Sequence, residues 1–267
     1  MKKKVWTLLL VALTMSSCGD YNKVLKSTDY QYKYEAAKGY YVDGKYNRTS
    51  TLLGEMITMF KGTAYGEESL YMLGMSYFNS EDWIEASSTF DRYTKSYPQG
   101  VYAELASYYK CLSLYNDTPE PRLDQTSTYQ AISAIQLFCE NYPMSPYKED
   151  AQQMMFKLQD KLVEKEYLSA KLYFDLGNYM GNNYQSCVIT AQNALRDFPY
   201  TERREDLSWL VLRAKYEMAV QSVEEKKVDR YRETIDEYYA YKNEFPEGKY
   251  LKDADKIFAN ATKVVKE

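Results

Sequence analysis

Residues 70–98 read LYMLGMSYFNSEDWIEASSTFDRYTKSYP, and this stretch decides the fold. Leu70, Leu73 and Tyr77 recur at helical spacing, which places them on one stripe of a first helix. A second apolar stripe follows a short polar interval and ends at Pro98. Proline cannot continue a helix and pushes its predecessor out of the helical region. The stretch therefore predicts a hairpin of two helices.

The order of residue types in this hairpin matches the tetratricopeptide repeat. Gly74 and Ala86 are small at the two positions where the helices of such a hairpin cross closely. Leu73, Tyr77, Phe90 and Tyr93 are large and fill the seam between the helices. We interpret all six positions as core residues that specify stacking, and we look for binding residues elsewhere.

The aromatic–proline pair that ends this hairpin recurs along the chain, and we call each occurrence a corner. An aromatic residue precedes Pro98, Pro143, Pro199 and Pro246, and Phe60-Lys61 is a related copy without proline. Counted from residue 61, these corners follow one another after 37, 45, 56 and 47 residues. Three of the four prolines are followed by tyrosine at +4 and alanine at +8, on one stripe of the next helix. The repetition predicts an all-α tetratricopeptide-repeat solenoid of about five repeats with a C-terminal capping helix.

Helix boundaries follow from these corners and from the intervening turns. Expected helices span about 29–42, 45–60, 101–115, 128–141, 147–180 and 184–197, with a fifth repeat over 202–244 and a capping helix over 249–265. Four segments result: a signal peptide at 1–17, a lipidated linker at 18–28, repeats one to three at 29–145, and repeats four and five with the capping helix at 146–267.

The first segment has the pattern of an export signal. Lys2–Lys4 are followed by an apolar run of 11 residues, Val5–Met15, interrupted only by two threonines. A membrane-spanning helix needs roughly 20 residues, so the run fits the central part of a secretory signal instead. Ser16-Ser17 lie directly before Cys18, and this junction resembles a bacterial lipoprotein signal. We expect Cys18 to carry lipid; the alternative is an ordinary secretory signal in which Cys18 is a bystander.

The composition argues against several classes of protein. The chain has no histidine, which excludes Ser-His-Asp catalysis, His-ligated metals and an imidazole pH switch. Neither a GxxxxGK[ST] nor a GxGxxG motif is present. The net charge of −4 becomes about −7 without Lys2–Lys4, so a general affinity for nucleic acid is not expected. We predict a protein that is not an enzyme and that needs no cofactor or metal.

Three cysteines remain after Cys18. The spacings between Cys111, Cys139 and Cys187 are 28 and 48 residues, and these are not the short spacings between the ligands of a metal site. Each lies among apolar residues of an expected helix, so we interpret them as small buried side chains. A disulfide between Cys111 and Cys139 is the alternative, and the sequence does not decide their redox state.

Binding residues are sought in the first helices of the repeats, because these line the concave groove of such solenoids. The groove candidates of the first two repeats are Tyr34, Glu35, Lys38, Tyr41, Glu68, Tyr71, Met75 and Phe78. Aromatic residues and methionine offer apolar contact area with little geometric demand, which suits an unfolded chain. The alternative for each of these residues is packing between repeats, since 30 tyrosines cannot all contact a ligand.

Further motifs resemble those of a known family. They are Asp43-Gly44-x-Tyr46 with Phe60, Asp124-Gln125-Thr126 with Ala131, Phe138, Tyr142-Pro143, Ser145, Tyr147 and Ala151, and Glu164-x-Glu166-Tyr167 with Ala170, Tyr173, Phe174 and Gly177. Their order over about residues 20–250, together with the lipoprotein start, resembles the BamD family of outer-membrane assembly lipoproteins. Lys61 in place of proline, a short 116–127 insertion and the helix after Pro246 depart from the family pattern.

The resemblance implies a subunit of the machinery that inserts β-barrel proteins into the outer membrane. Such a subunit is held by its lipid on the periplasmic face, binds unfolded barrel proteins, and contacts the periplasmic domains of the central barrel insertase. By analogy alone, the charged repeats four and five would dock that insertase. The rival interpretations are a lipoprotein of the same fold that binds glycans and one that binds cell-wall factors.

Overall fold

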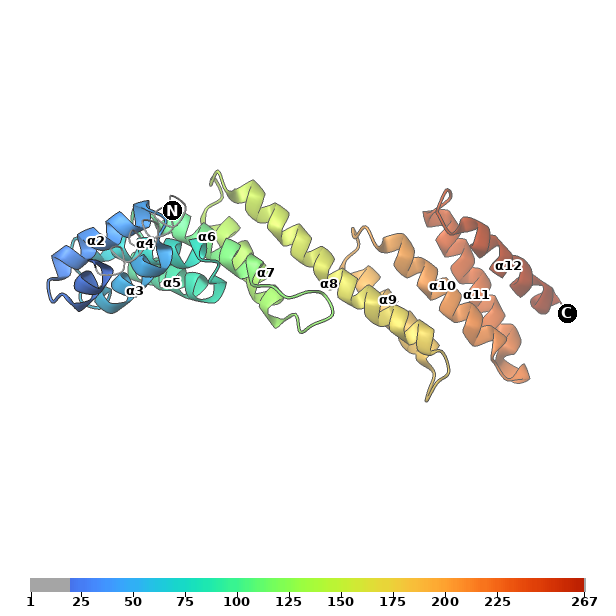
Figure 1. Cartoon of the computed structure of the whole chain (residues 1–267). Coiled ribbons are helices and arrows are strands. Elements are labelled where there is room, and N and C mark those ends of the chain that lie inside the picture. Colours follow the sequence, from blue (N-terminus) through green and yellow to red (C-terminus); the bar gives the residue numbers. More distant parts are fainter. Residues whose placement is uncertain (1–19, 267) are drawn as a thin grey trace, which may run out of the picture. The chain divides into compact units, whose positions relative to one another are not determined.

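The structure, a computed structural model, describes residues 20–266. Within this range every regular element is a helix, and residues 20–26 form a short helical segment before the first complete one. The helices are α2 (Tyr30–Val42), α3 (Tyr46–Met56), α4 (Gly66–Asn79), α5 (Trp83–Ser96), α6 (Ala103–Asn116), α7 (Thr126–Asn141), α8 (Lys148–Leu176), α9 (Asn183–Asp197), α10 (Arg204–Val220), α11 (Glu224–Glu244) and α12 (Leu251–Lys266) (Figure 1). The all-α repeat fold is confirmed.

The helices fall into two compact units. Unit 1 contains residues 20–118 and 129–153, and unit 2 contains residues 119–128 and 154–266. In unit 1, α2 packs on α3, α3 on α4, α4 on α5 and α5 on α6; in unit 2, α9 packs on α10, α10 on α11 and α11 on α12. The division falls inside α8, whereas the sequence placed a segment boundary at 145/146. The assignment of three repeats to one segment and two to the other stays a prediction.

Several helices end shortly before prolines, and two begin at acidic capping residues. α7, α9 and α11 end two residues before Pro143, Pro199 and Pro246, respectively. At two helix starts, an acidic side chain accepts backbone N–H groups that have no partner inside the helix: Asp29 from Gln31 and Tyr32, and Asp82 from Glu85. These local signals fix where each hairpin turns.

Two boundaries differ from the expectation. α3 ends at Met56 and not near residue 60, because residues 57–62 form successive turns with Gly62 at φ 79°. The turns keep Ile57 and Phe60 in the core, where both are buried. The fifth repeat, expected over 202–244, forms two helices as a hairpin should, but the Glu- and Lys-rich stretch 221–228, expected as its connector, is mostly helical. Only residues 221–223 separate α10 from α11, and α11 already begins at Glu224.

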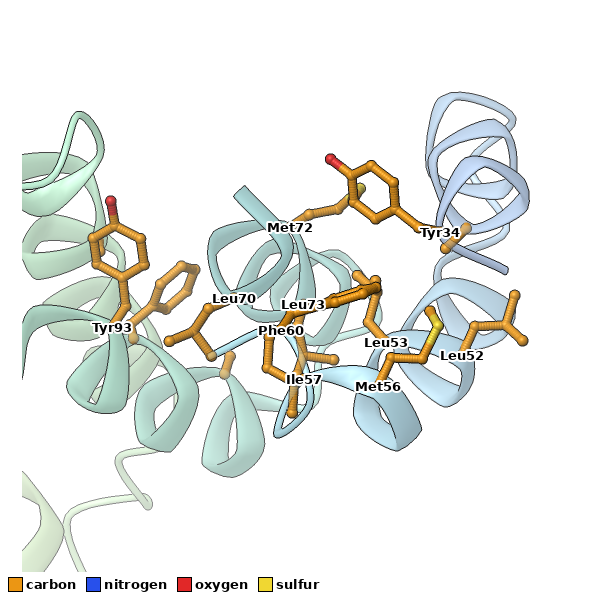
Figure 2. Close-up of a cluster of buried hydrophobic side chains, with 14 of the residues drawn as sticks. Tyr34, Leu52, Leu53, Met56, Ile57, Phe60, Leu70, Met72, Leu73 and Tyr93 are labelled. Atoms are coloured by element: carbon orange, nitrogen blue, oxygen red, sulfur yellow. The ribbon is translucent and has the colours of Figure 1, made fainter. Parts of the chain in front are cut away.

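The core of unit 1 contains apolar residues of the stretch 70–98. Leu52, Leu53 and Met56 of α3 belong to one buried cluster with Leu70 and Leu73 of α4, and Figure 2 shows Leu53 and Leu73 in the middle of this cluster. Separately, at the crossing of α4 and α5, a Cβ added to Gly74 would lie 2.7 Å from the ring of Phe90, which is fully buried. Gly74 is therefore required by the close approach of α5 and not by its own backbone conformation.

A polar contact fixes the corner between α5 and α6. Tyr93 donates its hydroxyl to Glu67 Oε1 at 2.6 Å, and the same oxygen accepts the backbone N–H of Val101 at 2.6 Å. A Cβ on Gly100 would come within 2.5 Å of that oxygen, so any larger residue would displace the Glu67 carboxylate from this arrangement. We call this arrangement the corner lock.

Unit 2 contains a second corner lock. Tyr241 donates to Glu205 Oε1 at 2.7 Å, the backbone N–H of Tyr250 points to the same oxygen at 3.4 Å, and a Cβ on Gly248 would lie 2.6 Å from it. Asp206 lies beside this lock with a side chain that is 7% exposed. It accepts from Lys249 at 2.6 Å, Tyr250 at 2.7 Å and Arg203 at 3.1 Å. These donors tie α10 to the start of α12.

The three cysteines of the described residues, Cys111, Cys139 and Cys187, are free thiols. Cys111 and Cys187 are buried, and burial raises the pKa of each thiol to about 12. Cys139 is half-buried, and burial also raises its pKa. The interpretation as buried side chains is confirmed for Cys111 and Cys187, and no Cys111–Cys139 disulfide is formed.

Candidate functional site

Corner tyrosines organise the aromatic residues of both units. At four of the five corners, the residue four positions later is a tyrosine that contacts an aromatic ring of the preceding first helix of a hairpin. The pairs and their centroid distances are Tyr34–Tyr65 at 4.9 Å, Tyr71–Tyr102 at 4.3 Å, Tyr108–Tyr147 at 4.6 Å and Trp209–Tyr250 at 5.2 Å. The last three pairs are stacked. Such pairs contribute about 0.5–1.5 kcal/mol beyond the burial of their area.

Tyr34 is a packing residue and not a groove contact. Its ring is 2% exposed, because Phe60 and Tyr65 cover it. Only its hydroxyl reaches a polar partner, donating to Glu68 Oε2 at 2.6 Å. Burial, followed by the bond to Glu68, raises the pKa of this phenol, which therefore stays neutral. The burial of this ring favours the alternative interpretation of Tyr34, which is packing between repeats.

Lys38 and Glu68 form a polar bridge between α2 and α4. Lys38 Nζ lies 3.1 Å from Glu68 Oε1. The bond from Tyr34 and this ion pair hold the pKa of Glu68 below its ordinary value, while its partial burial opposes them. The bond to Glu68 raises the pKa of Lys38. Both side chains are partly exposed and oppositely charged, so the bridge adds no net charge to the surface.

A half-buried aromatic surface connects α2, α4 and α6. We call it the tyrosine face, and it consists of Tyr41, Tyr71, Met75, Phe78, Tyr102 and Tyr109, all packed against the buried core of unit 1. Phe78 meets Tyr109 edge to face at 5.0 Å, and Tyr71 stacks on Tyr102. The structure thus brings four predicted residues together with two others.

The hydroxyl groups on the tyrosine face are close enough to influence one another. Burial raises the pKa of Tyr41, and the neighbouring Tyr46 and Tyr109 add to the shift. Burial likewise raises the pKa of Tyr71, with further contributions from Tyr109, Tyr41, Tyr102 and Tyr147. Tyr41 and Tyr71 therefore remain neutral at physiological pH. The face offers ring surface and neutral hydrogen-bonding groups, and contact with it should depend little on salt.

Glu35 is the remaining predicted residue. It is exposed on α2, and no hydrogen bond or ion pair joins it to the tyrosine face, although its charge acts on Tyr34 and Lys38. The adjacent carboxylates Glu67 and Glu68 diverge, since Glu67 belongs to the corner lock and Glu68 to the bridge with Lys38. They do not converge on a common point in the way that acid–base work on a substrate would require.

Sequence reasoning missed Tyr102 and Tyr109. Tyr102 carried a usable signal, since it is the tyrosine four residues after Pro98 and stacks on a predicted contact, Tyr71. Tyr109 carried none, because the repeat spacing of 37 aligns it with Met72, which is buried. Its position follows from the packing of α6 against α5, where it stacks on Phe90 at 5.7 Å.

Two other features of residues 20–266 bear on the site. None of the helices in this range is both long enough and apolar enough to cross a membrane. The same residues contain no group of three metal-ligating side chains. Cys18, the expected lipid attachment site, lies outside the described residues, as do the signal peptide at 1–17 and the second residue of the linker, Gly19.

Stacked helical hairpins with a half-buried aromatic face define a tetratricopeptide-type protein. A family model described as YfiO, outer membrane lipoprotein, matches residues 27–229. The chain therefore belongs to the YfiO family of outer membrane lipoproteins. This membership associates the chain with the outer membrane.

Curated relatives carry the name "Outer membrane protein assembly factor BamD". The protein of Neisseria meningitidis serogroup B is 22% identical over 94% of both chains. That of Pasteurella multocida is 23% identical over 64% of this chain and 70% of the relative. That of Caulobacter vibrioides is 25% identical over 50% of this chain, but the alignment spans only 44% of the relative. The resemblance to the BamD family is confirmed.

Proposed function

We propose that this protein is a non-enzymatic subunit of the outer-membrane β-barrel assembly machinery. It binds unfolded barrel proteins on the tyrosine face and is anchored through lipid on Cys18 at the periplasmic face of the outer membrane. Family membership and the names of the relatives support the general role. The lipoprotein-type junction before Cys18 supports the anchor.

The tyrosine face carries the substrate part of the proposal. Unfolded barrel proteins present alternating apolar and polar residues with many aromatic side chains. Half-buried rings of Tyr71, Phe78 and Tyr109 offer such a chain contact area without demanding one geometry. Met75 lies between them on α4 and adapts its shape to different side chains. Neutral hydroxyl groups can hydrogen-bond the backbone of an extended segment.

Substitution of three face residues tests this assignment. We expect Tyr41→Ala/Tyr71→Ala/Phe78→Ala to weaken binding of a fluorescently labelled peptide with alternating aromatic and polar residues at least tenfold, about 1.4 kcal/mol. Fluorescence anisotropy measures the affinity, and far-ultraviolet CD verifies that the variant is folded at the assay temperature. Binding to the unaltered protein should change little between low and moderate salt.

The chain offers a matched control. Tyr30, Tyr32 and Tyr129 are 41%, 50% and 58% exposed and do not belong to the tyrosine face. The triple alanine variant of these residues removes as many aromatic rings and should bind the peptide like the unaltered protein. Unchanged binding by the folded face variant, or an equal loss in the control, would refute the assignment.

The same proposal includes docking of the periplasmic domains of the central barrel insertase on repeats four and five. Mixed exposed charges such as Arg232 and Glu233 on α11 support it, since such surfaces tune docking rates. Removal of residues 202–267 should abolish pull-down of the insertase from solubilised envelope, and Arg232→Glu/Glu233→Lys should weaken it. Retention of the insertase by the truncated chain would contradict this docking site. Recovery of glycans or cell-wall enzymes in its place would favour the rival functions.

A further inference from the structure

A cleft of about 470 Å³ lies in unit 2, away from the tyrosine face. Four lining residues come from the first half of α8 and six from the corner between α9 and α10. They are Phe156, Gln159, Asp160 and Val163, followed by Asp197, Phe198, Pro199, Tyr200, Thr201 and Glu202. We call it the acidic cleft, because its lining contains three carboxylates and no lysine or arginine.

Two aromatic rings of the acidic cleft are unusually accessible. Phe156 is 61% exposed and Tyr200 is 98% exposed, although both are large side chains that folding would favour burying. Val163 and Phe198 contribute to the buried cluster of unit 2, so they provide an apolar base that is held in place. The cleft therefore combines a fixed apolar base with exposed rings.

The carboxylates of the acidic cleft are weakly compensated. Burial raises the pKa of Asp160, and the nearby charge of Glu202 raises it further. Asp197 pairs with Arg196 at 3.0 Å, but both side chains are more than half exposed, so solvent screens this pair. Mutual repulsion of Asp160 and Glu202 would be relieved by a cation bound between them.

Cations of this chain lie beside the acidic cleft but not in its lining. Lys157, Lys161 and Arg203 line an adjoining cleft that shares Asp160 and Glu202. Arg203 already pairs with Glu164 at 2.8 Å and with Asp206 at 3.1 Å. These cations therefore reduce the negative potential on the side of the acidic cleft that faces the adjoining cleft. The side formed by Phe156 and Tyr200 contains no cation from residues 20–266 and is accessible to a cation of a partner.

We propose that the acidic cleft docks a segment of another protein that carries lysine or arginine next to an aromatic or aliphatic residue. Charge complementarity selects this occupant, because three carboxylates repel anionic lipid headgroups and nucleic acid. The exposed rings of Phe156 and Tyr200 suit the methylene stem of lysine and the plane of arginine. The inference does not depend on the function of the tyrosine face, since it concerns a different surface and a different ligand chemistry.

The test uses the detergent-purified full chain and a fluorescently labelled peptide in which lysines flank a single phenylalanine, so that it offers no alternating aromatic pattern to the tyrosine face. We expect Asp160→Asn/Glu202→Gln to weaken its binding about tenfold, since each removed charge interacts at close range in a partly desolvated cleft. Phe156→Ala should also weaken it, and at 61% exposure this substitution does not threaten the fold. Raising the salt concentration should weaken binding to the unaltered protein.

Two controls separate the acidic cleft from the general negative charge and from the tyrosine face. Glu225→Gln/Asp236→Asn neutralises two exposed carboxylates on α11 and should leave the affinity within twofold. The tyrosine-face variant should bind the lysine peptide normally, so failure of either proposal is visible separately. A wild-type protein that does not bind the peptide, or equal losses in the cleft and α11 variants, overturns the inference. A dimer that dissociates in Asp160→Asn/Glu202→Gln also overturns it, because the occupant would then be a second copy of this chain.

Discussion

Replacement of Gly74 by alanine is the sharpest test of how α4 and α5 cross. The added Cβ would lie 2.7 Å from one carbon of the Phe90 ring and 2.9 and 3.0 Å from two others. Carbon atoms pack best at about 3.5–4.0 Å, so the ring would have to retreat by about 1 Å. Phe90 is fully buried, with Tyr109 and Tyr71 beside it, and has little free space to enter.

The magnitude follows from two opposing effects. Overpacking of a filled core costs about 1–3 kcal/mol, and a contact of this closeness belongs in the upper half of that range. Alanine is favoured over glycine inside a helix by about 1 kcal/mol. Gly74→Ala should therefore lower the free energy of unfolding by about 1–2 kcal/mol. Gly54, in α3, has no atom within 4 Å of an added Cβ, so Gly54→Ala should raise it by about 1 kcal/mol.

Urea denaturation followed by far-ultraviolet CD measures this contrast. The two variants should differ by about 2–3 kcal/mol, which corresponds to about 1 M urea between their midpoints. Because both glycines lie in helices of unit 1, independent unfolding of unit 2 affects both variants equally. If Gly74→Ala unfolds at the same urea concentration as Gly54→Ala, or at a higher one, the close crossing of α4 and α5 is not as described.

Three other outcomes follow from the structure. Burial acts to raise the pKa of Asp206, but bonds from Lys249, Tyr250 and Arg203 outweigh it and hold the pKa below its ordinary value. The resulting stability is present above about pH 4 and is lost as the pH falls through the lowered value, so urea midpoints of Asp206→Asn and the unaltered protein should converge in acid. At pH near 8, a disulfide reagent should modify the half-buried Cys139 in the native protein before the buried Cys111 and Cys187, as mass spectrometry of the digested protein would reveal; equal rates would contradict this order. Gly100→Ala should destabilise the protein by about 1–3 kcal/mol, since it displaces the corner-lock carboxylate, and a urea midpoint unchanged from the parent would contradict the lock.

Helix positions could be predicted because their signals are local. Proline corners, small residues and helical spacing act within one hairpin, and they located α4 to α9 within a few residues. The end of α3 escaped prediction because Lys61 replaces the corner proline and the turns are imposed by Gly62 and the burial of Phe60. The start of α11 lies earlier than expected, because the polar stretch 221–228 contains neither glycine nor proline to keep residues 224–228 out of the helix.

Which tyrosines are buried could not be predicted from spacing. The first-helix stripe contains both Tyr34 and Tyr41, yet only Tyr34 is enclosed, because Phe60 and Tyr65 come from the next corner to cover it. The position of Tyr109 on the tyrosine face likewise depends on its contacts with Phe78 and Phe90 of the preceding hairpin. Contacts between repeats determine the burial of Tyr34 and the position of Tyr109. Such contacts leave no regular spacing in the sequence from which they could be predicted.

The corner locks explain how two units of similar construction can present different surfaces. Glu205, Tyr241, Gly248 and Tyr250 repeat the contacts that Glu67, Tyr93, Gly100 and Tyr102 make in unit 1. In the same register, 138 residues further along the chain, Trp209 takes the position of Tyr71 and Arg213 that of Met75. Arg213 lies over the rings of Phe174 and Trp209 at 4.1 and 5.7 Å, so this part of unit 2 carries a positive charge where unit 1 is neutral. The two units therefore share the construction of their corners but differ in the charge of the equivalent face, so a ligand suited to the tyrosine face is not expected to bind the corresponding face of unit 2 in the same way.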